Sequence, residues 1–157
     1  MDIYFIRHGE TEYNKKHLHQ SADIPLTELG RKQAESIAPI IEKLQPTHII
    51  SSTHMRASET AKIASKDLEA SVSLNEVFVE LKRPTHIIGR SHFALTSIKY
   101  VVSWFLSKNE FYENEKRGES RLAFLNRLHD AKEYIESLPQ DAKVVVFSHS
   151  VFINYFV

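Results

Sequence analysis

The amino terminus joins a strand-like segment directly to reactive side chains. Ile3 to Ile6 is an unbroken run of β-branched and aromatic residues. A run of this kind predicts a strand of a parallel sheet that is buried on both faces. It is followed at once by Arg7, His8 and Gly9. Because ligands of open α/β sheets bind just past the carboxyl ends of the strands, this junction is the first candidate for a functional site.

Two later segments have a similar arrangement. Val144 to Phe147 is a second apolar run that is expected to be buried on both faces, and His149 follows shortly after it. The run 47–51 predicts another strand, and Arg56 lies in the first turns of the helix expected after it. A single basic residue at such a place is most simply a surface residue. Several strand ends that each deliver one favour an anion-binding site, since a helix amino terminus and a guanidinium both attract anions.

Helical patterns separate these strands. One helix is expected after Thr27, a favourable amino-terminal cap, and another after Gly118-Glu119-Ser120. This alternation predicts an α/β fold, a three-layer sandwich in which helices flank a mostly parallel central sheet. With 157 residues, the chain is expected to form a single domain, residues 1–157.

Three segments carry more detailed expectations. A β-rich stretch predicts a strand over Val72 to Val79 that leads to Glu80. The run from Ile98 to Leu106 predicts a helix, whose last aromatic and aliphatic residues are most simply part of the core. The helix after Ser120 is expected to bury an apolar face, formed by Leu122, Leu125, Leu128, Ala131 (or Ala123) and Ile135.

The composition excludes several classes of protein. Lys+Arg and Asp+Glu are both 20, so the formal net charge is zero, which does not favour a nucleic-acid or membrane-surface partner. No apolar run approaches the length of a membrane span. The absence of cysteine excludes disulfides, a thiolate nucleophile and a cysteine-type zinc site. No secretory leader is visible at the amino terminus, and we therefore expect a cytoplasmic protein.

The run Arg7-His8-Gly9-Glu10-Thr11 resembles the signature of the histidine phosphatase superfamily, which includes the phosphoglycerate mutases. Three later segments resemble the family's other motifs in the same order. They begin at Asp23, at Ser51 and at Gly118, and the strand that ends before His149 completes the series. The clearest departure is Ser150, where the family has glycine. The resemblance extends over most of the chain, and it favours the phosphatase branch.

The resemblance implies phosphoryl transfer through a covalent phosphohistidine on His8. Arg7, Arg56 and His149 would surround the phosphate, and Asn14 would add a hydrogen bond. Neutral imidazole is a good nucleophile near neutral pH, and guanidinium binds phosphate oxygens through charge-assisted hydrogen bonds, so the chemistry suits these residue types. No metal and no other cofactor are expected.

Two carboxylates are candidates for the general acid and base. Glu76 stands in Leu74-Asn75-Glu76, which resembles the mutases, and is expected in the middle of a strand. Glu80 ends a hydrophobic run 24 positions after Arg56 (80 − 56), a spacing that suits the phosphatase branch. Glu80 is therefore preferred, with Glu76 kept as the alternative.

Residues 82–117 match no motif of the family and are expected to form a small helical cap insertion over the active site. Its side chains would select the substrate, a phosphorylated small molecule or protein. Three functions are open at this point: a phosphomonoester phosphatase, a phosphoglycerate mutase-type phosphomutase, and a non-catalytic protein that binds a phosphorylated ligand. The chain ends soon after His149, and packing supplied by a second copy in a homodimer is one expected consequence.

Overall fold

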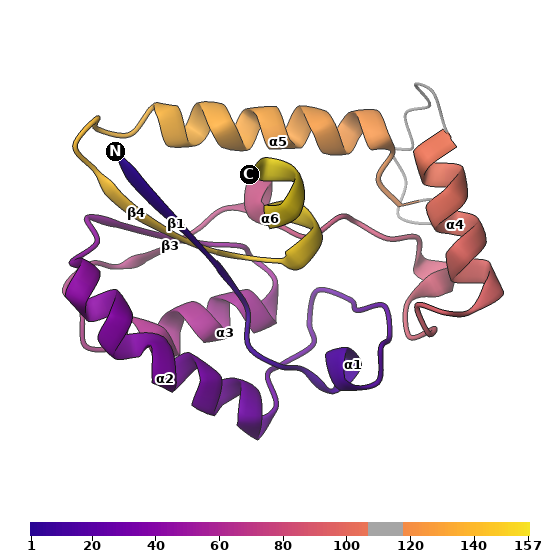
Figure 1. Cartoon of the computed structure of the whole chain (residues 1–157), viewed down its shortest axis with the longest axis horizontal. Helices are drawn as coiled ribbons and strands as arrows, with labels where there is room; N and C mark the ends of the chain where they lie inside the picture. Colours follow the sequence, from indigo (N-terminus) through magenta and orange to yellow (C-terminus); the bar gives the residue numbers. More distant parts are fainter. Residues whose placement is uncertain (107–117) are drawn as a thin grey trace.

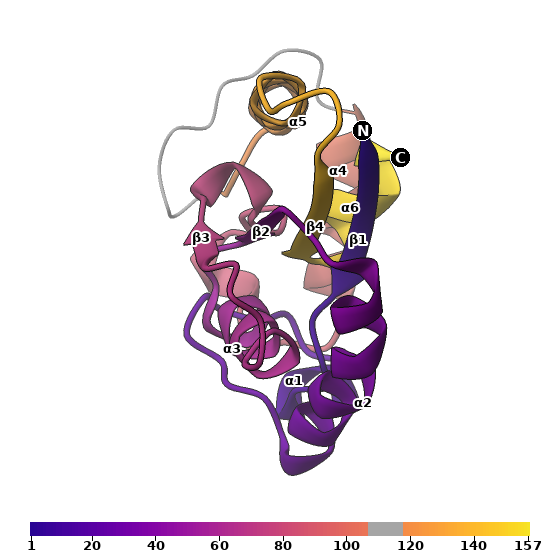
Figure 2. The same ribbon diagram turned by 90° about the vertical axis from the view of Figure 1, so that its left-hand side faces the viewer.

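Four parallel strands form the centre of the protein. The computed structural model describes residues 1–106 and 118–157. The strands are β1 (Asp2–Arg7), β2 (His48–Ser51), β3 (Val72–Leu74) and β4 (Lys143–Ser148), and their order across the sheet is β1-β4-β2-β3 (Figure 2). Every pairing between neighbours is parallel, so all carboxyl ends lie at one edge of the sheet.

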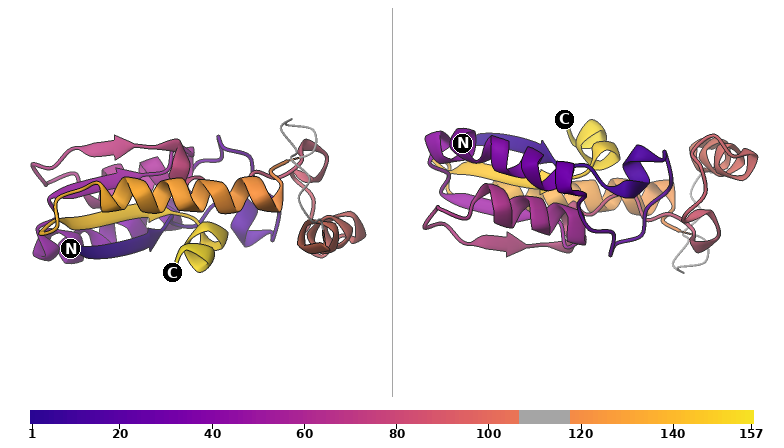
Figure 3. Two further views of the ribbon diagram at one scale, coloured as in Figure 1. Left: turned by 90° about the horizontal axis from the view of Figure 1, so that it is seen from above. Right: turned by 90° about the horizontal axis from the view of Figure 1, so that it is seen from below.

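Helices cover both faces of this sheet. The helices α2 (Glu28–Leu44) and α3 (Met55–Ala64) lie on one face, whereas α5 (Arg121–Glu136) and α6 (Ser150–Phe156) lie on the other (Figures 1 and 3). The two large helices of the sequence analysis begin as expected, because the side chains of Thr27 and Ser120 accept hydrogen bonds from the third residue of α2 and of α5, respectively. The predicted three-layer α/β fold is confirmed.

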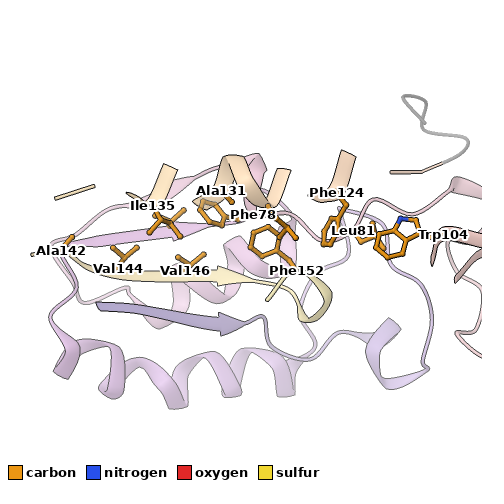
Figure 4. Close-up of a cluster of buried hydrophobic side chains, with 12 residues drawn as sticks. Phe78, Leu81, Trp104, Phe124, Ala131, Ile135, Ala142, Val144, Val146 and Phe152 are labelled. Atoms are coloured by element: carbon orange, nitrogen blue, oxygen red, sulfur yellow. The ribbon is translucent and has the colours of Figure 1, made fainter. Parts of the chain in front are cut away.

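The central strand β4 divides the core into two clusters. Val144 and Val146 face α5 and α6, together with Phe78 and Phe124, whereas Val145 and Phe147 face α2 and α3. Figure 4 shows the first cluster, whose labelled residues extend from Ala142 to Trp104. The four strand residues are 0% exposed, as expected for a strand that is buried on both faces.

The same prediction is wrong for β1. Ile3 is 40% exposed and Tyr4 is 37% exposed, because β1 is an edge strand that pairs only with β4 among the described residues. Phe5 and Ile6 pack against the two core clusters. The apolar run therefore identified the strand correctly, but not its place in the sheet.

The strand expected over Val72–Val79 is much shorter than predicted. It ends at Leu74, and a 3₁₀ helix, η1 (Glu76–Phe78), follows. Asn75 turns the chain, since its side-chain oxygen accepts a hydrogen bond from the amide of Val77 over 3.0 Å. Glu76 consequently begins a turn and is not in the middle of a strand.

The predicted apolar faces also need correction. Leu128, Ala131 and Ile135 are buried on α5 as expected, but Leu125 is 41% exposed and Phe124 takes the core position instead. Trp104 is buried, whereas Phe105 and Leu106 are 51% and 73% exposed. Trp104, Phe105 and Leu106 end a helix at the periphery of the protein, and only one side of this helix end packs against the core.

That peripheral helix, α4 (Leu95–Leu106), lies beyond the carboxyl ends of the strands (Figure 1). The expected insertion 82–117 also contains the 3₁₀ helix η2 (Thr85–Ile87), and its last eleven residues, 107–117, lie outside the described residues. A short helix, α1 (Glu12–Lys15), lies at the same edge of the sheet. Within the described ranges, no helix has the length and apolar character needed to span a membrane.

Candidate active site

The pairing of β1 with β4 brings two histidines to one place. Arg7 is in register with Ser148, and the amide of His8 donates to the Ser148 carbonyl over 3.1 Å. The residue that follows each strand is a histidine, His8 after β1 and His149 after β4. The ring centroids of His8 and His149 are 5.2 Å apart. Arg56 reaches the same place from the first turn of α3, and its Nε donates to Nε2 of His8 over 3.3 Å.

His8 is held as a neutral imidazole with a defined tautomer. Its Nδ1 lies 2.7 Å from the carbonyl oxygen of Gly9, and a carbonyl only accepts, so Nδ1 carries the proton and donates it. Burial, assisted by the nearby guanidinium of Arg56, lowers the pKa of His8 to about 3. Nε2 therefore presents a lone pair at neutral pH, which is the form that attacks phosphorus.

Close backbone contact fixes the loop that carries His8. A Cβ atom added to Gly9 would lie 2.4 Å from the carbonyl oxygen of Gly30, and one added to Gly30 would lie 2.2 Å from that of Glu10. The amide of Gly9 donates to Oγ1 of Thr60 over 3.0 Å. The signature loop is thus packed directly against the start of α2 and against α3.

Arg56 is buried, with 2% of its surface exposed. Besides Nε2 of His8, its guanidinium donates to the Ser21 carbonyl over 2.8 Å and contacts Nδ1 of His54 at 3.2 Å. Burial lowers the pKa of Arg56 to about 10, opposed by the charge of Glu80, so the side chain remains a cation at neutral pH. A buried cation of fixed orientation is well suited to bind an anion.

His149 is completely buried next to His8. Its Nε2 is 2.8 Å from Oγ of Ser52, and none of the described residues forms a hydrogen bond with Nδ1. Burial and the charge of Arg56 lower its pKa well below the usual value. The protein thus provides a hydrogen-bond partner for Nε2 of His149, whereas Nδ1 can still form a hydrogen bond.

Glu80 and Glu76 are separated clearly by their positions. Glu80 lines the same cavity as His8 and Arg56, whereas Glu76 is exposed and does not line it. The carboxylate of Glu80 accepts hydrogen bonds from the amides of Leu81 and Phe152 over 3.0 and 3.1 Å, and from Val151 over 3.3 Å. This carboxylate is therefore oriented by the first turn of α6.

Arg127 holds the segment that leads to Glu80. Its guanidinium pairs with both carboxylate oxygens of Glu119, over 2.8 and 2.7 Å, and donates to the carbonyls of Val77 and Val79 over 2.9 and 2.7 Å. The sequence did not indicate this bracing role of Arg127 and Glu119, because it depends on how α5 crosses residues 77–80.

Of the other predicted residues, Arg7 and Asn14 also line the cavity, which has a volume of about 940 Å³, whereas the buried His149 does not line it. Arg7 lies at its wall. Asn14 closes a capping box with Thr11, and none of the described residues accepts a hydrogen bond from its amide nitrogen, which is left for a ligand. The structure thus brings together all six residues singled out from the sequence: Arg7, His8, Asn14, Arg56, Glu80 and His149.

Two residues of the site were not predicted to take part in it. His54 lines the cavity between Arg56 and His149, with its ring centroid 5.0 Å from that of His149. The predictions from the sequence did not include His54. Ser150 also lines the cavity, and its buried Oγ has no hydrogen-bond partner among the described residues. Within the same residues, no group of three or more metal-ligating side chains is present.

Comparison with known proteins agrees with this geometry. A model of the histidine phosphatase superfamily (branch 1) matches residues 3–157. The chain belongs to this superfamily. Among similar histidine phosphatases, the probable phosphoglycerate mutase GpmB of Escherichia fergusonii is 29% identical over 157 residues, which cover 96% of this chain and 70% of that protein. GpmB of Proteus mirabilis is 27% identical over 154 residues, with the same coverage.

Two solved structures that resemble this chain are a hydrolase and a phosphatase. The mycobacterial hydrolase 1 superposes with a TM-score of 0.77 at 27% identity, covering 97% of this chain and 76% of that one. A mycobacterial glucosyl-3-phosphoglycerate phosphatase in complex with VO3 gives a TM-score of 0.74 at 28% identity, covering 97% and 77%. The names of these relatives are thus a probable mutase, a hydrolase and a phosphatase.

Proposed function

We propose that this histidine phosphatase homologue is a metal-independent phosphomonoesterase that acts through a phosphohistidine on His8. The observation that carries the proposal is the state of His8: a neutral ring whose Nδ1 proton is bound by a carbonyl and whose Nε2 lone pair faces the Arg56 guanidinium. A phosphoryl group placed against that guanidinium would lie in front of the nucleophile.

In the first step, Nε2 of His8 attacks phosphorus, and the bond to the leaving oxygen breaks. We expect Arg7 and Arg56 to contact the equatorial oxygens from the cavity wall and Asn14 to add a hydrogen bond, and we assign a third contact to the unpaired Nδ1 of the buried His149. A hydrogen bond to a charged group is worth about 1.5–3 kcal/mol, so several of them that strengthen in the transition state supply a large part of the acceleration. The guanidinium groups supply the positive charge that Mg²⁺ supplies in other phosphotransferases.

In both steps, Glu80 handles the proton. Its protonated carboxyl donates to the leaving alkoxide as the P–O bond breaks. The resulting carboxylate then removes a proton from water, whose oxygen attacks phosphorus and breaks the N–P bond. Free phosphate leaves, and both His8 and Glu80 return to their first state. Such acid–base catalysis contributes about 10²–10⁴-fold.

A phosphomutase is the second candidate, because several relatives are named probable phosphoglycerate mutases. A mutase must retain its phosphohistidine long enough to transfer the group to a second alcohol. A phosphatase transfers it to water. Supplying monophosphoglycerates with bisphosphoglycerate separates the two, since a mutase interconverts the monophosphates without net release of phosphate.

Phosphoenzyme trapping tests the proposal. The protein is mixed with ³²P-labelled substrate, quenched in base and analysed for acid-labile label. We expect label on the wild type and none on His8→Ala, with turnover lost in that variant. His129→Ala is the matched control, since His129 is an exposed residue of α5 paired only with Glu133 among the described residues. Unchanged hydrolysis by His8→Ala would exclude His8 as the nucleophile. A wild type that binds phosphate without any turnover would instead be a binding protein.

A further inference from the structure

A second basic cluster lines the cavity, formed by His19, Arg83 and His92. The mechanism above uses none of these three residues. The cavity volume of about 940 Å³ lies near the upper end of the range for small-molecule sites, about 300–1,000 Å³, so the cavity has room for much more than a single phosphoryl group. This second cluster is therefore a candidate for binding the part of the substrate that lies beyond its phosphoryl group.

Backbone hydrogen bonds tie the two segments of the cluster together. The amide of His19 donates to the Arg90 carbonyl over 3.0 Å, and its own carbonyl accepts from Gly89 over 2.8 Å. The amide of His92 donates to the carbonyl of His17 over 2.9 Å. This short antiparallel contact joins the loop after α1 to the segment before α4, so the backbone segments that carry His19 and His92 are fixed relative to each other.

His19 has unused hydrogen-bonding capacity in a buried position. His19 is only 4% exposed, and neither of its ring nitrogens has a hydrogen-bond partner among the described residues. The ring packs on that of His92, with centroids 4.4 Å apart. Buried polar groups are nearly always satisfied, because an unpaired one costs free energy. A ligand in the cavity would supply the missing acceptor or donor.

The charge at this part of the cavity favours an anion. Arg83 lies close enough to both imidazoles for its charge to help lower their pKa values, and none of the described residues forms an ion pair with it. Lys82 adds a second cation to the wall. Of the carboxylates that line the cavity, Glu119 is already paired with Arg127 through both oxygens, and Glu80 accepts hydrogen bonds from backbone amides at the start of α6. Neither forms an ion pair with this cluster among the described contacts.

We propose that His19, Arg83 and His92 form a second subsite, which binds an anionic group carried by the same substrate whose phosphoryl group lies at His8. The preferred substrates are then phosphomonoesters with a second phosphate or a carboxylate at the opposite end. The assignment of the two ends of the substrate rests on the proposed function, whereas the subsite itself is a statement about binding.

Phosphonates test the subsite without turnover, since their C–P bond is not hydrolysed. Calorimetry on the wild type compares an alkylphosphonate with an α,ω-bisphosphonate and an ω-carboxyalkylphosphonate of the same chain length, over several lengths. We expect one length to bind at least tenfold more tightly when either second anion is present; the better of the two anions identifies the group. Equal affinity at every length would overturn the proposal.

Variants locate the effect. Arg83→Gln should remove at least fivefold of the advantage of the doubly anionic ligand, and Arg83→Lys should restore part of it. His19→Gln should act in the same direction. Lys32→Gln, which removes an exposed cation of α2 paired with Glu28, should leave the advantage unchanged. An advantage that survives Arg83→Gln in full would place the second anion elsewhere and sink the assignment.

Matched phosphate esters separate the two proposals. If the esters are hydrolysed with no preference for a second anion, the subsite is wrong and the phosphatase proposal stands. If the bisphosphonate advantage is present and depends on Arg83, but no ester is hydrolysed, the subsite stands and the phosphatase proposal fails.

Discussion

The guanidinium of Arg56 donates from Nε to Nε2 of His8, over 3.3 Å. The cation and the nucleophile are thus in direct contact, and each affects the other. The charge of Arg56 helps to keep His8 neutral, and the direction of the bond aims the guanidinium along the lone pair of His8. A phosphoryl group that enters between them would exchange this contact for one with each partner.

The contact predicts that arginine and lysine are not interchangeable at position 56. Arg56→Lys retains a cation but cannot reproduce three hydrogen bonds in a planar geometry. With one charge-assisted bond lost, about 1.5–3 kcal/mol, kcat/KM should fall about 10- to 150-fold. The control is Arg31→Lys, because Arg31 pairs with Glu59 at the surface. A loss of less than threefold would contradict a precise role for the guanidinium.

Glu80→Gln should affect substrates according to their leaving groups. An aryl phosphate such as p-nitrophenyl phosphate needs little protonation as its P–O bond breaks, whereas an alkyl phosphate needs a general acid. We expect a loss of about 10²–10⁴-fold for alkyl esters and a much smaller loss for aryl esters in single-turnover measurements of phosphoenzyme formation. Glu76→Gln is the matched comparison, and the same pattern in that variant instead would transfer the role to Glu76.

Chelation of metal ions should leave activity intact. The proposed mechanism draws its positive charge from Arg7 and Arg56, so dialysis against EDTA should change kcat/KM by less than twofold. The assay needs a substrate that does not itself bind Mg²⁺ strongly, and p-nitrophenyl phosphate serves here. Strong inhibition, reversed by adding one divalent metal, would show that the mechanism proposed here is incomplete.

The free energy of unfolding should fall as the pH is lowered from about 6.5 to 4. Burial lowers the pKa of His8 to about 3, of His54 to about 4, and of His149 well below its usual value. In this range the unfolded chain binds protons that the folded protein excludes, so each such histidine reduces stability by up to about 1.4 kcal/mol per pH unit. Urea denaturation at several pH values measures the slope.

Two variants make this test specific. His54→Leu should reduce the slope, because it removes one of the buried histidines, whereas His129→Gln, at a histidine whose side chain is 70% exposed, should not change it. Phosphate buffers must be avoided, since an anion that binds only the folded state would stabilise it. A flat profile between pH 6.5 and 4 would mean that these imidazoles are protonated in the folded state.

Gly30→Ala should destabilise the fold. The added Cβ would lie 2.2 Å from the carbonyl oxygen and 2.9 Å from the amide nitrogen of Glu10, and backbone atoms cannot rotate out of the way as a side chain does. We expect a loss of about 1–3 kcal/mol, as for other overpacked positions, together with reduced activity because the displaced segment adjoins His8. Lys32→Ala, at an exposed position of the same helix, is the control in thermal denaturation. Equal stability of the two variants would show that the loop adapts freely.

The sequence by itself determined which local structures form and which chemistry they carry. Apolar runs located β1 and β4, and Thr27 and Ser120 fixed the starts of α2 and α5 through their own side chains. These features depend on neighbours along the chain, so they can be predicted without coordinates. The basic residues that follow the strands indicated an anion site for the same reason.

Only the tertiary structure decided which of these elements lies at an edge and what surrounds each side chain. The exposure of Ile3, the place of Glu80 in the cavity wall and the contact of His19 with His92 all depend on residues distant in sequence. Burial is a property of the whole arrangement of neighbours in space, and it sets both the strand's environment and the pKa of His8. A local pattern contains the reactive group, but the fold determines its protonation state and what it faces.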